Sequence, residues 1–263
     1  MLYEGAGLRW ARLKRKKAMS TASLVLLSDQ LAIQRSVDIV ANNIANSSTT
    51  GFKREGVQFS TFLSQPSSSQ KTSFVYDRAT YRDTTAGTIT STGNPLDLAI
   101  QKDGYFQIQT PQGVQYTRNG AFRTDSQGQI VNSSGMPLLS DGGQPLILPD
   151  DARDLTISSD GYVTAQVGTS SSRAQLGKIG VVTFPDGQQV IPAGNGLLTT
   201  AQTPTPVLTN SIVQGATESS NVQPVAEITN LIQLQRAYEQ ASNLITAEST
   251  RLSDAIDKLS QTT

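Results

Sequence analysis

Near the start of the chain, apolar residues recur at the period of an α-helix. They follow one another at intervals of seven, four, three and four residues, with polar residues between them, at Leu26, Ile33, Val37, Val40 and Ile44. The stretch that follows, ANNIANSSTTGFKREG at 41–56, is polar and contains Gly51, which can take the left-handed conformation. The pattern therefore predicts an amphipathic helix that ends near residue 46.

A second apolar seam lies at the other end of the chain. It repeats at intervals of three and four residues, and only Glu248 interrupts it, among Leu231, Leu234, Tyr238, Ala241, Ile245, Glu248, Leu252, Ala255 and Leu259. Pro224 suits a first helical turn, Glu227 the positive end of a helix and Lys258 the negative end. One helix is predicted over about 224–260, and at ~1.5 Å per residue it is roughly 50 Å long.

Between these two segments the pattern changes to short alternating runs, of which YFQIQ at 105–109 is an example. The runs are separated by Asx-Gly pairs, which supply the positive φ angles of tight turns, at Asp103-Gly104, Asn119-Gly120, Asp141-Gly142, Asp160-Gly161 and Asp186-Gly187. We predict an antiparallel β domain over 74–218, with YTRNGAF at 116–122 as its clearest hairpin.

The predicted fold class is mainly β with terminal α-helices: a central antiparallel β domain is flanked by N- and C-terminal helices that pair as a coiled-coil-like bundle. Neither helix can hide a long apolar stripe against a compact β domain, so each needs the other helix or another copy of the chain. Two arrangements meet this need. One is a two-helix stalk folded back on itself, and the other is a subunit of a coaxial assembly.

Composition excludes many kinds of chemistry. The 263 residues, 37% hydrophobic and 16% charged, suit a soluble globular chain of one or two domains. Cysteine and histidine are both absent, which excludes disulfides, thiolate or imidazole metal sites and His-based catalytic triads. The 21 basic residues balance 21 acidic ones, so no net field attracts nucleic acid or an anionic membrane.

The remaining candidates for site chemistry are weak. Asp150 and Asp151 are adjacent, so on one strand they point to opposite faces, which is poor geometry for a glycoside hydrolase. DSQGQ at 125–129 lacks the alternating acidic loop of a calcium-binding EF-hand. No catalytic, cofactor-binding or metal-binding residue is predicted. An extracellular adhesin with a β body on a helical stalk is the alternative to an assembly subunit.

The N-terminal region has some features of a secretory signal, because LRWARLKRKK is followed by ASLVLL. Its uninterrupted apolar core, at 24–27, is shorter than the roughly 7 to 15 residues that such a signal needs. No other stretch approaches the ~20 apolar residues of a membrane span. We expect neither a cleaved signal nor membrane insertion.

Four segments carry a resemblance to a known family: ANNIANSSTTGFKRE at 41–55, GNPLDLAIQKDGYFQI at 93–108, YTRNGAFRTDSQGQIV at 116–131 and ESSNVQPVAEITNLIQLQRAYE at 218–239. They resemble, in order, the signature segments of flagellar basal-body rod proteins. SDQLAIQRSVDIVANNIANSSTTGFK at 28–53 and VYDRATYRDTTAGTI at 75–89 are most similar to the proximal-rod type, with the distal-rod type as the close competitor.

The resemblance implies a structural subunit of the flagellar rod. Such a protein is exported unfolded by the flagellar type III apparatus, without a cleaved signal, and polymerises in the periplasmic space. The implied partners are copies of itself, other rod proteins and the export apparatus, with no nucleic acid and no cofactor. Family members place their terminal helices in an inner tube and the β domain outside it.

The resemblance also sets the expected domain boundaries. Because the family is similar only from MSTASLVLL onward, residues 1–18 are interpreted as a mis-assigned start or a disordered extension. Residues 19–50 are then the N-terminal assembly helix, 51–73 a linker that includes SQPSSSQKTS, 74–218 the β domain and 219–263 the C-terminal assembly helix.

The implied assembly interface combines the two seams with the residues that match the family signatures. The signature residues are Asn42, Asn43, Asn46, Gly51, Phe52, Ser220, Asn221, Val222, Arg236, Ala237, Tyr238 and Glu239. Gly51 is predicted to permit the turn out of the helix, and Phe52 to anchor the linker by burying its ring. Arg236 and Glu239 lie on one helical face, where they pair with each other or a neighbouring subunit, or form a solvated surface pair.

Overall fold

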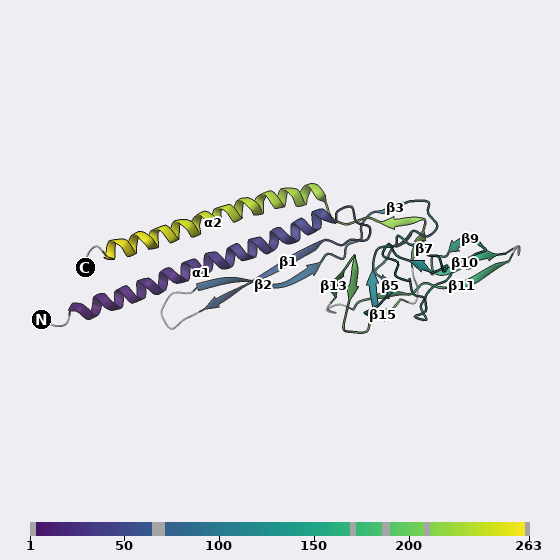
Figure 1. The fold of residues 1–263 in the computed structure, drawn as a ribbon, viewed down its shortest axis with the longest axis horizontal. Coiled ribbons are helices and arrows are strands. Elements are labelled where there is room, and N and C mark those ends of the chain that lie inside the picture. The colour runs from purple at the N-terminus through teal and green to yellow at the C-terminus, as the bar shows by residue number, and fades with distance from the viewer. Residues whose placement is uncertain (1–3, 65–71, 169–171, 186–189, 208–210, 261–263) are drawn as a thin grey trace. The chain divides into compact units, whose positions relative to one another are not determined.

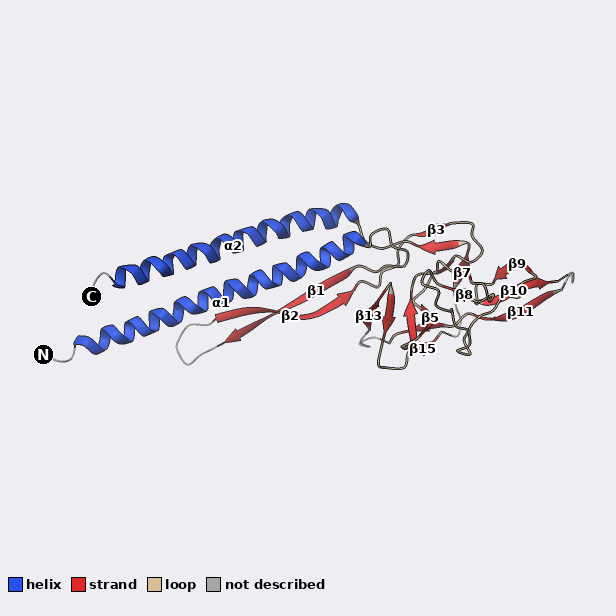
Figure 2. Cartoon of the chain, viewed as in Figure 1, coloured by secondary structure: helices blue, strands red, loops and turns tan. Residues whose placement is uncertain are grey.

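The computed structural model describes residues 4–64, 72–168, 172–185, 190–207 and 211–260. The chain divides into two compact units (Figures 1 and 2). Unit 1 comprises residues 1–45, 55–83 and 223–263, and unit 2 comprises residues 46–54 and 84–222.

Unit 1 contains both long helices, α1 (Glu4–Ala45) and α2 (Pro224–Ser260), which lie side by side in Figure 1. The predicted C-terminal end of α1 and both predicted ends of α2 are confirmed to within a residue or two. The predicted seam positions up to Ala255 are buried or half-buried on both helices, whereas the side chain of Leu259 lies outside the described residues. The 3.6-residue periodicity therefore identified the covered face of each helix.

Helix α1 begins earlier than the sequence predicted. Residues 4–18, for which a disordered extension was one alternative, continue the helix as EGAGLRWARLKRKKA. Ala, Leu, Arg and Lys dominate this stretch and all have high helix propensity, which explains its conformation without any tertiary contact.

Unit 1 also contains a long antiparallel hairpin, β1 (Glu55–Ser64) and β2 (Thr72–Arg82), which contacts α1. Part of the expected linker at 51–73 is therefore a strand, and the first residues of the expected β domain belong to unit 1. Serines suggested a linker, but GVQFSTFL can pair across the hairpin with a strand supplied from further along the chain. The central part of the serine-rich stretch, 65–71, lies outside the described residues.

Unit 2 is built from short antiparallel strands, as the sequence predicted. A six-stranded sheet has the order β13-β14-β6-β5-β12-β15, a three-stranded sheet has the order β11-β10-β9, and three strand pairs are β16-β4, β17-β3 and β7-β8. The strands are β3 (Ile89–Ser91), β4 (Leu98–Ile100), β5 (Tyr105–Thr110), β6 (Gly113–Thr117), β7 (Arg123–Thr124), β8 (Ile130–Val131), β9 (Ala152–Ile157), β10 (Tyr162–Val167), β11 (Arg173–Lys178), β12 (Val181–Thr183), β13 (Ile191–Gly194), β14 (Leu197–Thr199), β15 (Thr205–Pro206), β16 (Ile212–Gln214) and β17 (Ala216–Glu218).

The hairpin predicted at 116–122 is wrong. Strand β6 pairs with β5 through a two-residue turn at 111–112, and on its other side with β14. After Thr117 the chain leaves the sheet, because Arg118 is buried in a polar cluster and Gly120 packs so closely on Leu98 that an added Cβ would lie 1.6 Å from the Leu98 carbonyl oxygen. The Asx-Gly pair at Asp160-Gly161, in contrast, does form the turn between β9 and β10, with Gly161 at φ 89°.

The main core of unit 2 gathers large apolar side chains from most of its strands. The rings of Phe106 and Phe122 pack edge to face with centroids 5.3 Å apart, and Ile108, Leu138 and Ile179 are fully buried beside them. This core holds the loops that leave the sheets, including the loop after β6, in fixed positions. Among the described residues, no helix is long and apolar enough to cross a membrane.

Candidate structural site: a buried ion cluster

The N-terminal signature contributes first to unit 1. The side chain of Asn43 is fully buried and binds the backbone of Glu55 twice: its amide nitrogen donates to the Glu55 carbonyl over 2.8 Å, and its oxygen accepts from the Glu55 N–H over 2.9 Å. The side chain thereby acts as the backbone of a neighbouring strand would, tying β1 to the end of α1. Asn42, next to it, is exposed.

The same signature then makes a turn within unit 2. The Thr49 N–H donates to the Asn46 carbonyl over 3.1 Å and the Phe52 N–H to the Thr49 carbonyl over 3.2 Å. Gly51 adopts φ +70°, as predicted, and its N–H donates to the carbonyl of Glu218 over 2.7 Å. A Cβ on Gly51 would lie 2.5 Å from backbone atoms of Arg118 and Asn119, so only glycine fits.

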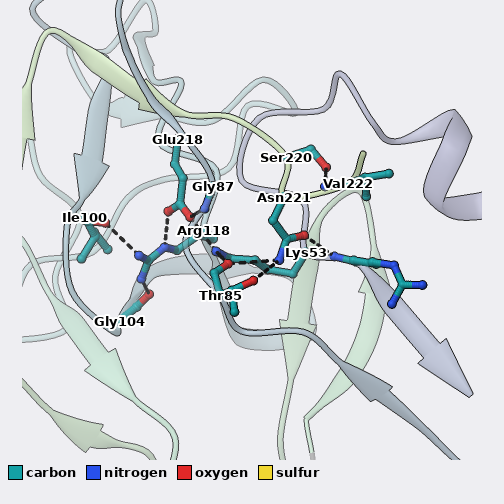
Figure 3. Close-up of polar contacts among 11 residues, drawn as sticks. Lys53, Thr85, Gly87, Ile100, Gly104, Arg118, Glu218, Ser220, Asn221 and Val222 are labelled. Atoms are coloured by element: carbon teal, nitrogen blue, oxygen red, sulfur yellow. Dashed lines mark hydrogen bonds and ion pairs between the residues drawn. The ribbon is translucent and has the colours of Figure 1, made fainter. Parts of the chain in front are cut away.

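Glu218, at the end of β17, is the centre of a buried polar cluster (Figure 3). Its Oε1 accepts from Lys53 Nζ over 2.5 Å and from the Gly87 N–H over 2.8 Å, and its Oε2 accepts from Arg118 Nε over 2.5 Å. Lys53 is 5% exposed, Arg118 7% and Glu218 1%, so all three charges are out of contact with bulk water. We refer to Lys53, Thr85, Gly87, Arg118 and Glu218 as the Glu218 cluster.

Backbone carbonyls complete the coordination of both cations. Arg118 donates from its two terminal nitrogens to the carbonyls of Gly104 and Ile100, over 2.5 and 2.8 Å, and Lys53 donates to the carbonyl of Thr85 over 2.7 Å. Such hydrogen bonds offset part of the cost of removing the charges from water.

Asn221 extends the cluster toward the start of α2. Its Oδ1 accepts from the Arg54 N–H over 2.7 Å, while its Nδ2 donates to the carbonyl and hydroxyl oxygens of Thr85 over 3.0 and 3.1 Å. The residues just after α1 and just before α2 are thus bonded to each other within unit 2.

The electrostatics keep Glu218 ionised. Burial by itself would raise the pKa of its carboxyl, but the hydrogen bonds from Lys53 and Arg118, the charge of Arg118 and the Gly87 N–H outweigh burial and hold the pKa below its ordinary value. A carboxylate that accepts hydrogen bonds from three donors in this way is suited to holding segments together rather than to moving protons.

Every signature segment identified in the sequence supplies either a residue of this cluster or a hydrogen-bond partner of one. Residues 41–55 supply Lys53, 75–89 supply Thr85 and Gly87, 93–108 supply the carbonyls of Ile100 and Gly104, 116–131 supply Arg118, and 218–239 supply Glu218 and Asn221. The motifs are separate in sequence and meet at one place in space.

The predicted site residues divide into two groups. Gly51 and Asn221 lie at the cluster, and Val222 is buried beside them, with its N–H donating to the Ser220 hydroxyl over 3.2 Å. Arg236 and Glu239 are both exposed, and among the described residues no ion pair joins them. Phe52 is half-buried.

Lys53, Arg118 and Glu218 were missed by the sequence reasoning, although all three stand inside the quoted motifs. One feature of the sequence could have indicated them: each of these three motifs carries a charged residue among small, polar, turn-forming residues. Two of these residues are cationic and one is anionic, so they can form ion pairs. Nothing in the sequence alone indicated that residues 53, 118 and 218 meet, because their separations are 165 and 100 residues.

Comparison with known proteins matches three parts of the chain to three family models. Residues 29–53 match "Flagella basal body rod protein", 99–165 match "Flagellar hook protein FlgE/F/G D1 domain", and 213–258 match "Flagellar basal body rod FlgEFG protein C-terminal". These matches contain Lys53, Arg118 and Glu218.

Whole-chain relatives extend this result. The flagellar basal-body rod protein FlgF of Caulobacter vibrioides is 40% identical over 249 residues, covering 92% of this chain and 98% of the relative. This chain belongs to the flagellar basal-body rod protein family. Other rod proteins that it resembles are FlgF of Mesorhizobium japonicum, 35% identical over 92% of this chain and 98% of the relative, and FlgG of C. vibrioides, 36% identical over 87% and 94%.

Membership of the rod protein family confirms that the chain is a structural subunit of the flagellar rod and not an enzyme. For a rod protein, a saturated ion cluster at the meeting point of the family's motifs is best understood as part of the architecture. The expected resemblance, inferred from the same motifs, is confirmed as well.

Proposed function

We propose that this chain is a subunit of the proximal rod and that it polymerises through its terminal helices. The assignment to the proximal rather than the distal rod is supported by two relatives from one bacterium. FlgF of C. vibrioides is 40% identical to this chain over 92% of its length, and FlgG of the same bacterium is 36% identical over 87%.

The observation that carries the polymerisation proposal is apolar surface left on both helices of unit 1. On α1, Leu24, Leu27 and Leu31 are 55%, 46% and 62% exposed. On α2, Val225, Ile228 and Ile232 are 79%, 47% and 46% exposed. In each helix the three residues follow intervals of three and four, so they form a stripe on one face.

These stripes are additional to the seams. In this proposal the seams are the faces on which α1 and α2 pair with each other in a coiled-coil-like manner, which is supported by their intervals of three and four residues and by the burial of their side chains. The stripes need a different cover, and fully burying a side chain of this size contributes about 1.5–3 kcal/mol. Six such side chains per subunit supply a substantial driving force for association with neighbouring subunits.

In this proposal, neighbouring copies and other rod proteins cover the stripes, and the chain reaches the periplasmic rod by flagellar type III export. The route and the partners follow from the family resemblance. The stripes add a physical reason for assembly, since covering large apolar side chains that are exposed on the single chain is favourable.

The test is an in-frame deletion of the gene in its own bacterium, followed by complementation. Cells without the gene are expected not to swim, and electron microscopy of isolated basal bodies is expected to show truncated rods without hooks. The wild-type gene restores both. Normal swimming with complete basal bodies in the deletion strain overturns the proposal and favours an adhesin.

Variants then test the stripes. Leu31→Lys and Ile232→Lys each place a charge on a stripe that is exposed in the single chain, so the variants should fold but fail to restore rods. Gln233→Lys is the matched control, because Gln233 is exposed on α2 beside the stripe and its replacement by lysine adds the same charge. If Ile232→Lys restores full rods as well as Gln233→Lys does, the α2 stripe is not an assembly surface.

A further inference from the structure

The Glu218 cluster joins the two segments through which unit 2 is connected to the helices. We define the N-terminal root as residues 46–54, directly after α1, and the C-terminal root as residues 216–222, directly before α2. Both roots belong to unit 2. Lys53 is in the first root and Glu218 in the second, and the Gly51 and Arg54 amides donate to Glu218 and Asn221 of the second.

The distribution of charge along the chain is unequal. The cations lie at 53 and 118, early in unit 2, and the carboxylate that both contact lies 165 and 100 residues further on, at the end of the last strand. Without Glu218 in place, the charges of Lys53 and Arg118 would be buried near each other without the negative charge of its carboxylate. Removing one partner from a buried charge group is strongly unfavourable, so the cations do not settle into this site until β17 has joined the sheet.

Close packing around the Glu218 cluster leaves the backbone of the two roots little room for another arrangement. Gly51 and Gly87 both lie where backbone approaches backbone: a Cβ on Gly87 would lie 1.9 Å from the Ser219 carbonyl oxygen, and one on Gly51 would lie 2.5 Å from Arg118. The segments therefore interlock, and the N-terminal root is held by contacts that the C-terminal root supplies.

We infer that the Glu218 cluster is a completion latch: the N-terminal root becomes ordered only when the C-terminal root is in place, so the connections to both helices are fixed together. Lys53 and Arg118 supply the cations of the latch, and Glu218 closes it by pairing with both. The inference rests on the proposed function for its purpose, which is that only a complete subunit presents ordered connections to both assembly helices.

Hydrogen exchange on the isolated full-length chain tests the latch. The reporting amides are those of Gly51 and Arg54 in the N-terminal root and Ser219, which donates to the Thr88 carbonyl over 2.9 Å, in the C-terminal root. The core reference is the Leu138 amide, which donates to the Ile130 carbonyl over 2.8 Å.

Two variants distinguish a latch from simple stabilisation. In Glu218→Gln, the amides of both roots should exchange faster by a similar factor of roughly tenfold or more, because two buried cations lose their counter-charge, while the core reference is unchanged. In Lys53→Met, Gly51 and Arg54 should exchange faster while Ser219 stays protected, because Glu218 keeps Arg118.

Glu248→Gln is the matched control. It removes the same charge from another ion pair, with Arg251 at 2.8 Å, whose arginine is 69% exposed, and it should leave the root amides unchanged. The inference is overturned if Glu218→Gln accelerates the core reference as much as the roots, or leaves the N-terminal root unaffected. If Glu218→Gln does not fold, Lys53→Met decides: equal loosening of both roots, or of neither, contradicts the latch.

These outcomes are separable from those of the proposed function. Exchange is measured on the isolated chain and needs no flagellum, whereas the deletion strain measures rods and swimming. A deletion strain with complete rods rejects the assembly role even if the roots respond as a latch, and uncoupled roots reject the latch even if the rod is missing.

Discussion

Replacing Asn43 by alanine should destabilise unit 1 far more than replacing an ordinary asparagine. The Asn43 side chain is fully buried, and its two hydrogen bonds, of 2.8 and 2.9 Å, satisfy both backbone polar groups of Glu55. Asn43→Ala removes both partners at once. The first signature segment thus places inside the subunit a residue that the sequence assigned to the assembly interface.

The magnitude follows from the burial of the groups left behind. An unsatisfied buried donor or acceptor costs about 1–3 kcal/mol. Glu55 is half-buried, so water can reach it in part, and the lower end of this range applies to each group. We expect a loss of about 2 kcal/mol, which lowers the urea midpoint by roughly 1 M for an m-value of about 2 kcal/mol per M.

Circular dichroism at the helical wavelength is a suitable assay, because α1 and α2 both belong to unit 1. Asn243→Ala is the control, since Asn243 is exposed on α2, and it should change the free energy of unfolding by less than about 0.5 kcal/mol. If Asn43→Ala is as mild as Asn243→Ala, the paired hydrogen bonds to Glu55 do not hold β1 to α1.

Three further predictions concern the cluster and the stripes. Because the pKa of Glu218 is lower in the folded state than its ordinary value of 4.5, the ionised carboxylate should stabilise the fold fully at pH values above 4.5. This stabilisation should be lost as the pH falls from 4.5 through the lowered folded-state pKa, and Glu218→Gln should lack that part of the pH dependence of stability. Gly51→Ala should lower thermal stability by more than Gly135→Ala. Both glycines have positive φ, a conformation that costs an alanine about 1–2 kcal/mol, but only at Gly51 would the added Cβ also lie 2.5 Å from backbone atoms. Ile228→Lys should leave the free energy of unfolding of the isolated chain within about 0.5 kcal/mol of wild type while abolishing rods in the complementation assay.

The helical ends of the chain could be predicted because their signals are local. A seam such as Leu231, Leu234 and Tyr238 states which face of a helix is covered, and Pro224 and Lys258 mark where the helix begins and ends. The antiparallel character of the β unit was also predictable, since alternation and Asx-Gly turns act within a few residues.

The errors arose where distant segments decide the local structure. YTRNGAF carries the sequence of a hairpin, but Arg118 finds its partner 100 residues away and draws the chain out of the sheet. The serine-rich stretch suggested a linker, yet β1 pairs with β2 from the far side of that stretch. In both cases tertiary contacts outweighed a local preference worth about 1 kcal/mol.

The sequence by itself determined the two amphipathic helices, the β body between them and the family. Hydrophobic periodicity and turn chemistry depend on residues close together in the sequence, and the order of the motifs can be read directly along the chain. Only the tertiary structure decided that Lys53, Arg118 and Glu218 form one buried cluster and that Asn43 serves β1. The physical reason is that the sequence gives the type of a charged residue but not whether it is solvated or buried in an ion pair. Their difference in free energy depends on desolvation and on partners that only the folded chain brings together.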